Sequence, residues 1–337
     1  MLKYCSSHLR PSMRRPSAVL MATAAALTAF VMAAPRSRAA ILASDNAANY
    51  SATTGNSNLW PNGSATLSGG QGFGPWTFNN QTPGTSYARE YLAIPSYAWP
   101  TSEAIASGGG YIWGLYAGGQ STGNVPSAAA YRAFENSAGS GLGTLRSGQS
   151  FSVAAAVRTN NSALGIGTTG EGSIPATIGV GLLTFGSTSN APVWNVSFSE
   201  LPAGVGGNTT SSTALETTIT DANGVANYIQ GASANALSIN GLVGGVTLAF
   251  SLGAANTYTF TISPAAGNTA LAAPLSYSGN INGSINGVGL FDSMSADDAI
   301  YNNMAITAST ATPEPGGLLL IAAGLGATLT LRRRFTR

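Results

Sequence analysis

Short stretches in which apolar and polar residues alternate recur along the middle of this chain, and they restrict its fold more than any other feature. In "TYTFTIS", at residues 257–263, Tyr258, Phe260 and Ile262 alternate with threonines. A period of two places successive side chains on opposite faces of a strand, so that one face can be buried while the other meets water. This stretch therefore predicts a half-buried β-strand.

Comparable stretches, separated by Gly, Pro, Asn and Ser, predict a series of short strands. They lie at residues 150–159, 177–186, 193–200, 214–221, 245–253, 257–264, 287–293 and 300–307. The fifth and sixth are joined only by "AAN", which favours a hairpin. Many short strands at this spacing predict an all-β fold, an antiparallel β-sandwich of the jelly-roll kind. Because no linker divides residues 40–311, we expect them to form one domain.

The segment before residue 150 is rich in glycine and lacks clear alternation. It holds four of the five tryptophans, Trp60, Trp76, Trp99 and Trp113. Aromatic side chains bury a large apolar area, so we expect these four in the core of the sandwich. Stacking of their rings on sugars is the functional alternative.

The first 39 residues have the pattern of an export signal. Basic residues precede the apolar run 18–34, and "SRA" at residues 37–39 offers small side chains for cleavage. Arg14 and Arg15 raise a twin-arginine route, although Pro16 departs from its usual pattern. An uncleaved membrane anchor is the other interpretation of this segment.

Charge and composition exclude several classes of function. Only 8% of the residues are charged, and residues 40–311 carry four basic against eleven acidic side chains, a net charge of about −7. Such a body cannot form the basic surface that nucleic acid requires. His8 and Cys5 are the only histidine and cysteine, and both lie in the predicted signal. The mature protein would therefore lack a Ser-His-Asp triad and any zinc site built on His or Cys.

Asp292, Asp297 and Asp298 form the densest acidic cluster of the body. Ca²⁺ is bound by several oxygen ligands, so this cluster predicts a structural calcium site, with a solvated loop as the alternative. "DANG", at residues 221–224, predicts a turn instead, because Ala232 stands where a calcium loop needs its bidentate acid.

The C-terminal residues 312–337 have three parts in a fixed order. Pro313, Glu314 and Pro315 come first, an apolar segment follows at 316–331, and a basic tail at 332–337 begins with Arg332, Arg333 and Arg334. A helix of sixteen residues is about 24 Å long, close to the thickness of a membrane core. The arginines would keep its end at the cytoplasmic face. An ordinary C-terminal membrane anchor is the plain interpretation.

This order of parts resembles the PEP-CTERM sorting signal of exported proteins in Gram-negative bacteria. The resemblance implies a precursor anchored in the inner membrane, and release of the protein by an exosortase, a membrane cysteine peptidase. "GFGPWTF" and "GVGLFDS…YNNMAI" also resemble the ends of the concanavalin-like sandwiches of that family. The resemblance thus implies a non-catalytic protein of the cell envelope or extracellular matrix that contacts exopolysaccharide.

A carbohydrate-active hydrolase or lyase that uses carboxylates alone is the alternative function. It would need two carboxylates facing one groove at roughly 5–10 Å. No Glu-x-Asp-x-x-Glu stretch, common in concanavalin-like glycosidases, is present in the sequence.

Overall fold

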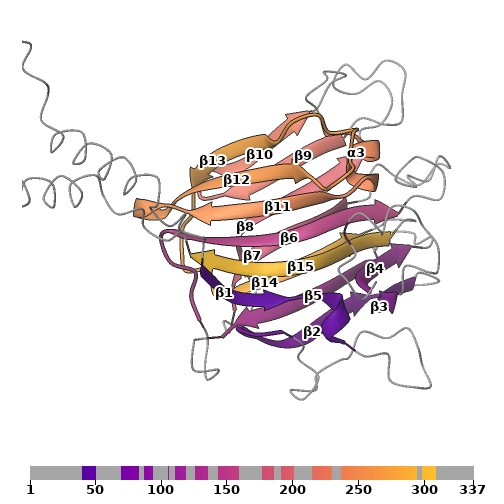
Figure 1. Ribbon diagram of the computed structural model, residues 1–337, viewed down its shortest axis with the longest axis horizontal. Coiled ribbons are helices and arrows are strands. Elements are labelled where there is room, and N and C mark those ends of the chain that lie inside the picture. The colour runs from indigo at the N-terminus through magenta and orange to yellow at the C-terminus, as the bar shows by residue number, and fades with distance from the viewer. Residues whose placement is uncertain are drawn as a thin grey trace, which may run out of the picture. The chain divides into compact units, whose positions relative to one another are not determined.

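Two antiparallel β-sheets lie face to face (Figure 1). This computed structural model describes residues 40–50, 70–82, 87–93, 105, 111–118, 126–135, 143–158, 177–185, 191–200, 215–229, 237–293 and 298–308.

The strands alternate between the two sheets along much of the chain. Sheet A contains β1 (Ala40–Asp45), β3 (Tyr87–Ala93), β4 (Ile112–Gly118), β6 (Gln149–Arg158), β11 (Val246–Leu252), β12 (Thr257–Pro264), β13 (Leu275–Asn280) and β15 (Asp298–Ala308). Sheet B contains β2 (Phe73–Gln81), β5 (Ser127–Phe134), β7 (Thr177–Thr184), β8 (Ala191–Glu200), β9 (Leu215–Asp221), β10 (Gly224–Ile229) and β14 (Gly287–Ser293). Short helical turns are η1 (Ala47–Asn49), α3 (Ile239–Val243) and η3 (Ala254–Asn256).

The order of strands places the last two near the middle of the sheets. Sheet A runs β13-β12-β11-β6-β15-β4-β3, with β1 paired to β15, and sheet B runs β10-β9-β8-β7-β14-β5-β2. The edges are therefore β13 and β10 at one end of the sandwich and β3 and β2 at the other (Figure 1). β1 is a further edge strand of sheet A, because β15 is its ladder partner on one side and an isolated bridge, Ser44↔Gln71, is its contact on the other.

The core fills the space between the sheets with aromatic and branched side chains. Trp194 of β8 packs against Phe250 of β11 and Phe260 of β12, with ring centroids 5.0 and 4.9 Å apart. Trp76 of β2 meets Trp113 of β4 edge to face at 5.4 Å. Each of these contacts joins sheet A to sheet B, so the aromatic rings hold the two layers together.

The eight strands predicted from alternation are all confirmed within two residues of their expected bounds. Tyr258, Phe260 and Ile262 are buried, as the period of two predicted. The hairpin is confirmed as well, because β11 pairs with β12 from Val246↔Pro264 to Leu252↔Tyr258. The alternation of residues did not predict β1 to β5, β10 and β13.

The core position predicted for the tryptophans is confirmed for two of them. Trp76 and Trp113 are 2% and 0% exposed. Trp60 and Trp99 lie outside the described residues. No helix in the part of the chain that the structure describes is long and apolar enough to cross a membrane. The predicted span at 316–331 and the signal at 1–39 fall outside that part.

Candidate functional site

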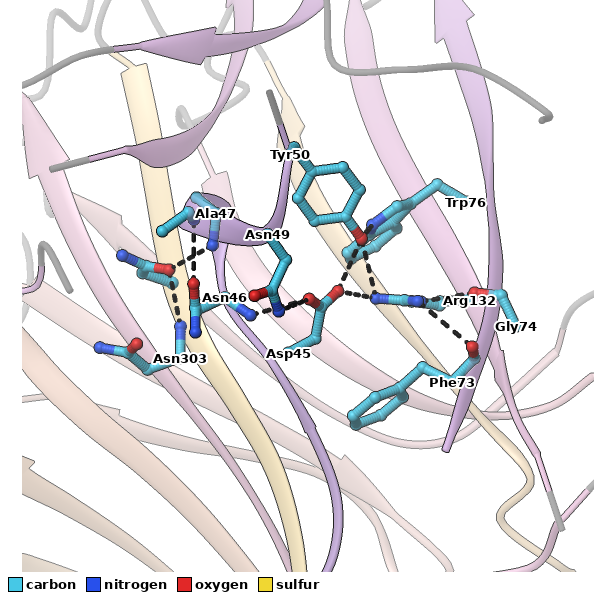
Figure 2. Close-up of polar contacts among 12 residues, drawn as sticks. Asp45, Asn46, Ala47, Asn49, Tyr50, Phe73, Gly74, Trp76, Arg132 and Asn303 are labelled. Atoms are coloured by element: carbon cyan, nitrogen blue, oxygen red, sulfur yellow. Dashed lines mark hydrogen bonds and ion pairs between the residues drawn. The ribbon is translucent and has the colours of Figure 1, made fainter. Parts of the chain in front are cut away.

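A buried ion pair between Asp45, at the end of β1, and Arg132 of β5 is the most elaborate polar cluster among the described residues. Both side chains are fully buried. One carboxylate oxygen, Oδ2, accepts from Arg132 Nη1 and from the Tyr50 hydroxyl at 2.6 Å. The other accepts from the Asn46 amide and from Asn49 Nδ2, each at 2.8 Å (Figure 2). The carboxylate is thus surrounded by donors.

The remaining donors of Arg132 are used by the backbone of β2. Arg132 Nε donates to the Gly74 carbonyl at 2.6 Å, and Nη2 donates to the Phe73 carbonyl at 3.3 Å. The guanidinium carbon lies 5.0 Å from the ring centroid of Phe73 and 4.9 Å from that of Trp76. Figure 2 shows the guanidinium between these residues, with Asp45 at its end. A guanidinium is well suited to such a place, because it combines planar donors with a face that stacks on aromatic rings.

Burial dominates the electrostatics of this cluster. It raises the pKa of the Asp45 carboxyl above its ordinary value, and the charge of Arg132 opposes that rise. It also raises the pKa of the Tyr50 hydroxyl, which stays neutral and donates to Asp45. Because β1 belongs to sheet A and β5 to sheet B, the cluster fastens the two sheets to each other. Its polar groups are bonded to the protein itself, which makes it a structural site.

Two asparagines in β15, Asn302 and Asn303, lie next to this cluster, and Asn302 connects β15 to the turn that follows β1. Asn302 Oδ1 accepts from the Ala47 amide at 2.9 Å, and its Nδ2 donates to the carbonyls of Ile105 and Tyr111 at 3.0 and 2.9 Å. The next residue, Asn303, has φ of 51°, and the register of β15 against β6 shifts between Asn302 and Ala305. The bulge therefore turns a buried amide toward the turn that follows β1.

The outer face of sheet A carries a second polar group, which we call the Arg89 row: Arg89, Tyr116, Asp298 and Arg158. The four residues are register partners on neighbouring strands, Arg89↔Tyr116, Tyr116↔Asp298 and Asp298↔Arg158. They face outward, because the residues next to them in β4, β6 and β15, such as Leu115, Val157 and Ala299, belong to the core between the sheets.

Two tyrosine rings hold the Arg89 side chain. Its guanidinium carbon lies 5.9 Å from the ring centroids of Tyr91 and of Tyr116. Tyr91 fits there because Gly114 has no side chain: a Cβ on Gly114 would lie 2.1 Å from the Tyr91 ring. Burial raises the pKa of Tyr91, and the charge of the nearby Asp298 adds to that effect.

Of the charged residues in the row, Arg158 and Asp298 form an ion pair with each other, whereas Arg89 does not belong to that pair. Arg158 Nη1 donates to Asp298 Oδ2 at 2.9 Å, with side chains 23% and 9% exposed. Arg89 is exposed and takes part in neither of the two ion pairs found among the described residues. Tyr87, two residues before it on the same face of β3, is 69% exposed. The row thus offers solvent a guanidinium and tyrosine side chains on a sheet surface.

Two of the acidic residues predicted to bind calcium, Asp292 and Asp298, lie in different sheets. Asp292 of β14 is buried on the inner face of sheet B, in line with Val288 and Leu290. Asp298 lies in the Arg89 row, and Asp297 lies outside the described residues. Within the described ranges, no group of three His, Cys, Asp or Glu side chains could hold a metal ion. The calcium site stays a prediction.

The other predicted sites have separate outcomes. The sorting residues Pro313, Glu314, Pro315, Arg332, Arg333 and Arg334 lie outside the described residues, so sorting stays a prediction. The turn predicted at residues 221–224 is confirmed. It joins β9 to β10, and Asp221 Oδ1 accepts from the Asn223 amide at 2.7 Å.

Neither buried Arg132 nor the Arg89 row was predicted from the sequence. The members of each group are far apart along the chain, and a lone arginine in an alanine-rich stretch such as "SAAAYRAF" gives no signal of burial. The alternation of tyrosine and arginine in "YAREY" of β3 is the one signal that could have indicated an exposed polar face.

Comparison with known proteins gives only distant likenesses. No protein-family model matches the chain, and no curated protein matches it. Among solved structures, the exoplasmic/lumenal domain of VIP36 in its Ca²⁺/Man3GlcNAc-bound form is 10% identical, with a TM-score of 0.37 over 71% of this chain and 89% of that one. The globular domain of Trypanosoma cruzi calreticulin is 11% identical, with a TM-score of 0.35 over 68% and 82%. A lectin from Bauhinia forficata in complex with GalNAc is 10% identical, with a TM-score of 0.30 over 69% and 98%. Likenesses this distant assign no ligand to this chain.

Proposed function

We propose that this chain is an exported, non-catalytic protein of the cell envelope or extracellular matrix, whose sandwich, of the concanavalin-like kind, binds exopolysaccharide through the Arg89 row. The single observation that carries the binding proposal is the exposed guanidinium of Arg89 held between the rings of Tyr91 and Tyr116. Export and sorting rest on the signal pattern at 1–39 and on the three-part tail at 312–337.

The chemistry of the row suits a sugar polymer. Tyr87, 69% exposed beside Arg89 on the same face of β3, presents a ring whose negative face attracts the weakly positive C–H groups of a sugar ring. A guanidinium donates several hydrogen bonds in one plane, which suits hydroxyl or carboxylate oxygens. The row crosses neighbouring strands from β3 to β6, so it can contact successive units of an extended polymer.

A non-catalytic role is supported by how the described carboxylates are used. Asp45 and Asp298 are each bonded to an arginine. Glu90 Oε2 accepts from Asn80, and Asp221 Oδ2 accepts from the Tyr258 hydroxyl at 2.8 Å. A general acid or base needs a carboxyl group that can exchange protons with a substrate. Four of the carboxylates are instead committed to contacts within the fold.

Loss of the Arg89 row should weaken carbohydrate binding. We expect Arg89→Ala and Tyr116→Ala each to raise the dissociation constant for the native exopolysaccharide about tenfold or more, since each removes a direct contact worth roughly 1–3 kcal/mol. Isothermal titration calorimetry with purified exopolysaccharide, and with neutral and uronate-containing polysaccharides, measures the change. Arg146→Ala is the matched control, because Arg146 is an exposed arginine outside the row. Equal affinities for all three variants and the parent would rule out the row as the binding site.

Processing should remove both ends of the chain. Mass spectrometry of the protein from the native envelope should find neither residues 1–39 nor the tail that begins with Arg332.

Variants of the tail test which of its parts are recognised. Glu314→Ala should stop trimming but not insertion, because the apolar segment is unchanged. Replacing Arg332, Arg333 and Arg334 by Ser should instead weaken membrane retention. An intact C-terminus on the mature form, or normal trimming of Glu314→Ala, would contradict recognition by an exosortase.

A further inference from the structure

One end of the sandwich has two edge strands without the charges, prolines and bulges that often prevent pairing with another strand. We call it the β10/β13 edge, formed by β10 (Gly224–Ile229) of sheet B and β13 (Leu275–Asn280) of sheet A (Figure 1). Their sequences, GVANYI and LSYSGN, contain no charged residue and no proline. Both pair with their inner neighbours in an uninterrupted register, without a bulge.

The opposite end of the sandwich is protected in the usual ways. There β2 contains Pro75, and its register against β5 shifts between Phe73 and Trp76. Its companion edge β3 carries the charged residues Arg89 and Glu90. Proline, bulges and charges are devices by which proteins keep an edge strand from pairing with another chain. Their presence at one end and absence at the other indicates that the β10/β13 edge is used for pairing.

The exposed surface of β10 fits this use. Every residue from Ala222 to Tyr228 is exposed, and Val225 and Tyr228 are 67% and 37% exposed. Asp221 and Gly224 flank a two-residue loop, and in such a hairpin the flanking residues form a hydrogen-bonded pair. Hydrogen-bonded and non-hydrogen-bonded pairs alternate along an antiparallel ladder, so Val225 and Asn227 belong to non-hydrogen-bonded pairs. Their backbone N–H and C=O groups therefore point away from β9. These donors and acceptors are available to a further strand.

The strands β10 and β13 lie side by side at this end, so a partner that pairs with both needs two adjacent strands. The rings of Tyr228 and Tyr277, from β10 and β13, have centroids 4.6 Å apart, and the Ala222 amide donates to the Asn280 carbonyl at 3.1 Å. A partner that covers both must present two strand edges at the same spacing. A single extended peptide covers only one, whereas a second copy of this chain has the matching pair.

The geometry points to a homodimer in which the β10/β13 edges of two copies pair about a two-fold axis perpendicular to the sheets. Such an axis sets β10 antiparallel to its copy and β13 antiparallel to its copy, so both sheets continue across the interface. Tyr228 and Val225, exposed in one copy, become covered in the pair. This inference does not depend on carbohydrate binding or on sorting.

Two edge variants test the dimer by different means. Val225→Lys places a cation on the edge strand of each copy, and Asn227→Pro removes an outward N–H while a proline remains compatible with an edge. Thr220→Lys is the matched control, because Thr220 of β9 is the register partner of Val225 but lies one strand away from the edge. Sedimentation velocity of the full chain in a mild detergent, over a range of concentrations, measures the dissociation constant.

We expect a dimer for the parent and for Thr220→Lys, and a dissociation constant raised about tenfold or more by either edge variant. Circular dichroism checks that each variant keeps its β-sheet. The inference is overturned if the parent is a monomer at every concentration. It is overturned equally if Thr220→Lys weakens the dimer as much as Val225→Lys, or if folded edge variants dimerise like the parent.

Discussion

Arg132→Met should lower the free energy of unfolding by about 3–5 kcal/mol, because it leaves the carboxylate of Asp45 buried without its counter-charge. The substitution also removes the hydrogen bonds to the Phe73 and Gly74 carbonyls and the contacts with two aromatic faces. Methionine fills much of the same volume, so a cavity contributes little to the loss. Urea unfolding monitored by tryptophan fluorescence measures the change.

Arg158→Met is the control for this experiment. It breaks the other Arg–Asp pair among the described residues, which is partly exposed, so it should cost only about 1 kcal/mol. Adding Asp45→Asn to Arg132→Met should recover part of the loss, since no uncompensated charge remains. Similar costs for Arg132→Met and Arg158→Met would mean that the Asp45–Arg132 pair does not fasten the sheets.

Alkaline solution should unfold the sandwich steeply. Tyr50 and Tyr301 are 2% and 1% exposed, and burial raises the pKa of both hydroxyls above the ordinary value. The Tyr301 hydroxyl lies 2.8 Å from the Gly179 carbonyl and 3.1 Å from the Phe291 carbonyl, across the sandwich. Above about pH 10 the unfolded chain loses protons that the folded chain keeps, so stability falls as pH rises. Each tyrosine contributes about 1.4 kcal/mol per pH unit, hence about 2.8 kcal/mol per pH unit for the two.

Urea midpoints at increasing pH, followed together with tyrosinate absorbance, test this slope. In the double variant Tyr50→Phe, Tyr301→Phe, the free energy of unfolding should fall much less steeply with pH than in the parent. Tyr87→Phe is the matched control, because it removes a hydroxyl from a tyrosine that is 69% exposed. If the absorbance of Tyr50 and Tyr301 rose in the folded protein well before unfolding, their hydroxyls would have to be accessible to water.

The part of the fold that could be predicted from the sequence is the part where one strand face is apolar and the other is polar. β12 is the clearest case, since its buried Tyr258, Phe260 and Ile262 alternate with threonines. β5 was missed because its apolar residues are mostly alanines, and both of its faces are largely buried. β10 and β13 were missed because edge strands bury too little to require strong alternation.

The sites depend on register, which no local pattern contains. Asp45 and Arg132 are separated by 87 residues, and Arg158 and Asp298 by 140. Their pairing follows only from which strands become neighbours and by how many residues they are offset. The acidic cluster looked continuous in sequence, yet the strand reversal places Asp292 and Asp298 on different sheets.

The position of β14 and β15 has a consequence for the kinetics of folding. Without β15, sheet A would consist of three separate pieces, β13-β12-β11-β6, β4-β3 and β1, and without β14, sheet B would divide between β7 and β5. The nascent chain therefore cannot complete either layer until its last strands, Gly287–Ser293 and Asp298–Ala308, become available. Their insertion joins segments distant in sequence, which is the slow kind of step in β proteins. Up to that moment unpaired inner strands remain open to aggregation, and we expect chaperones to act on this intermediate.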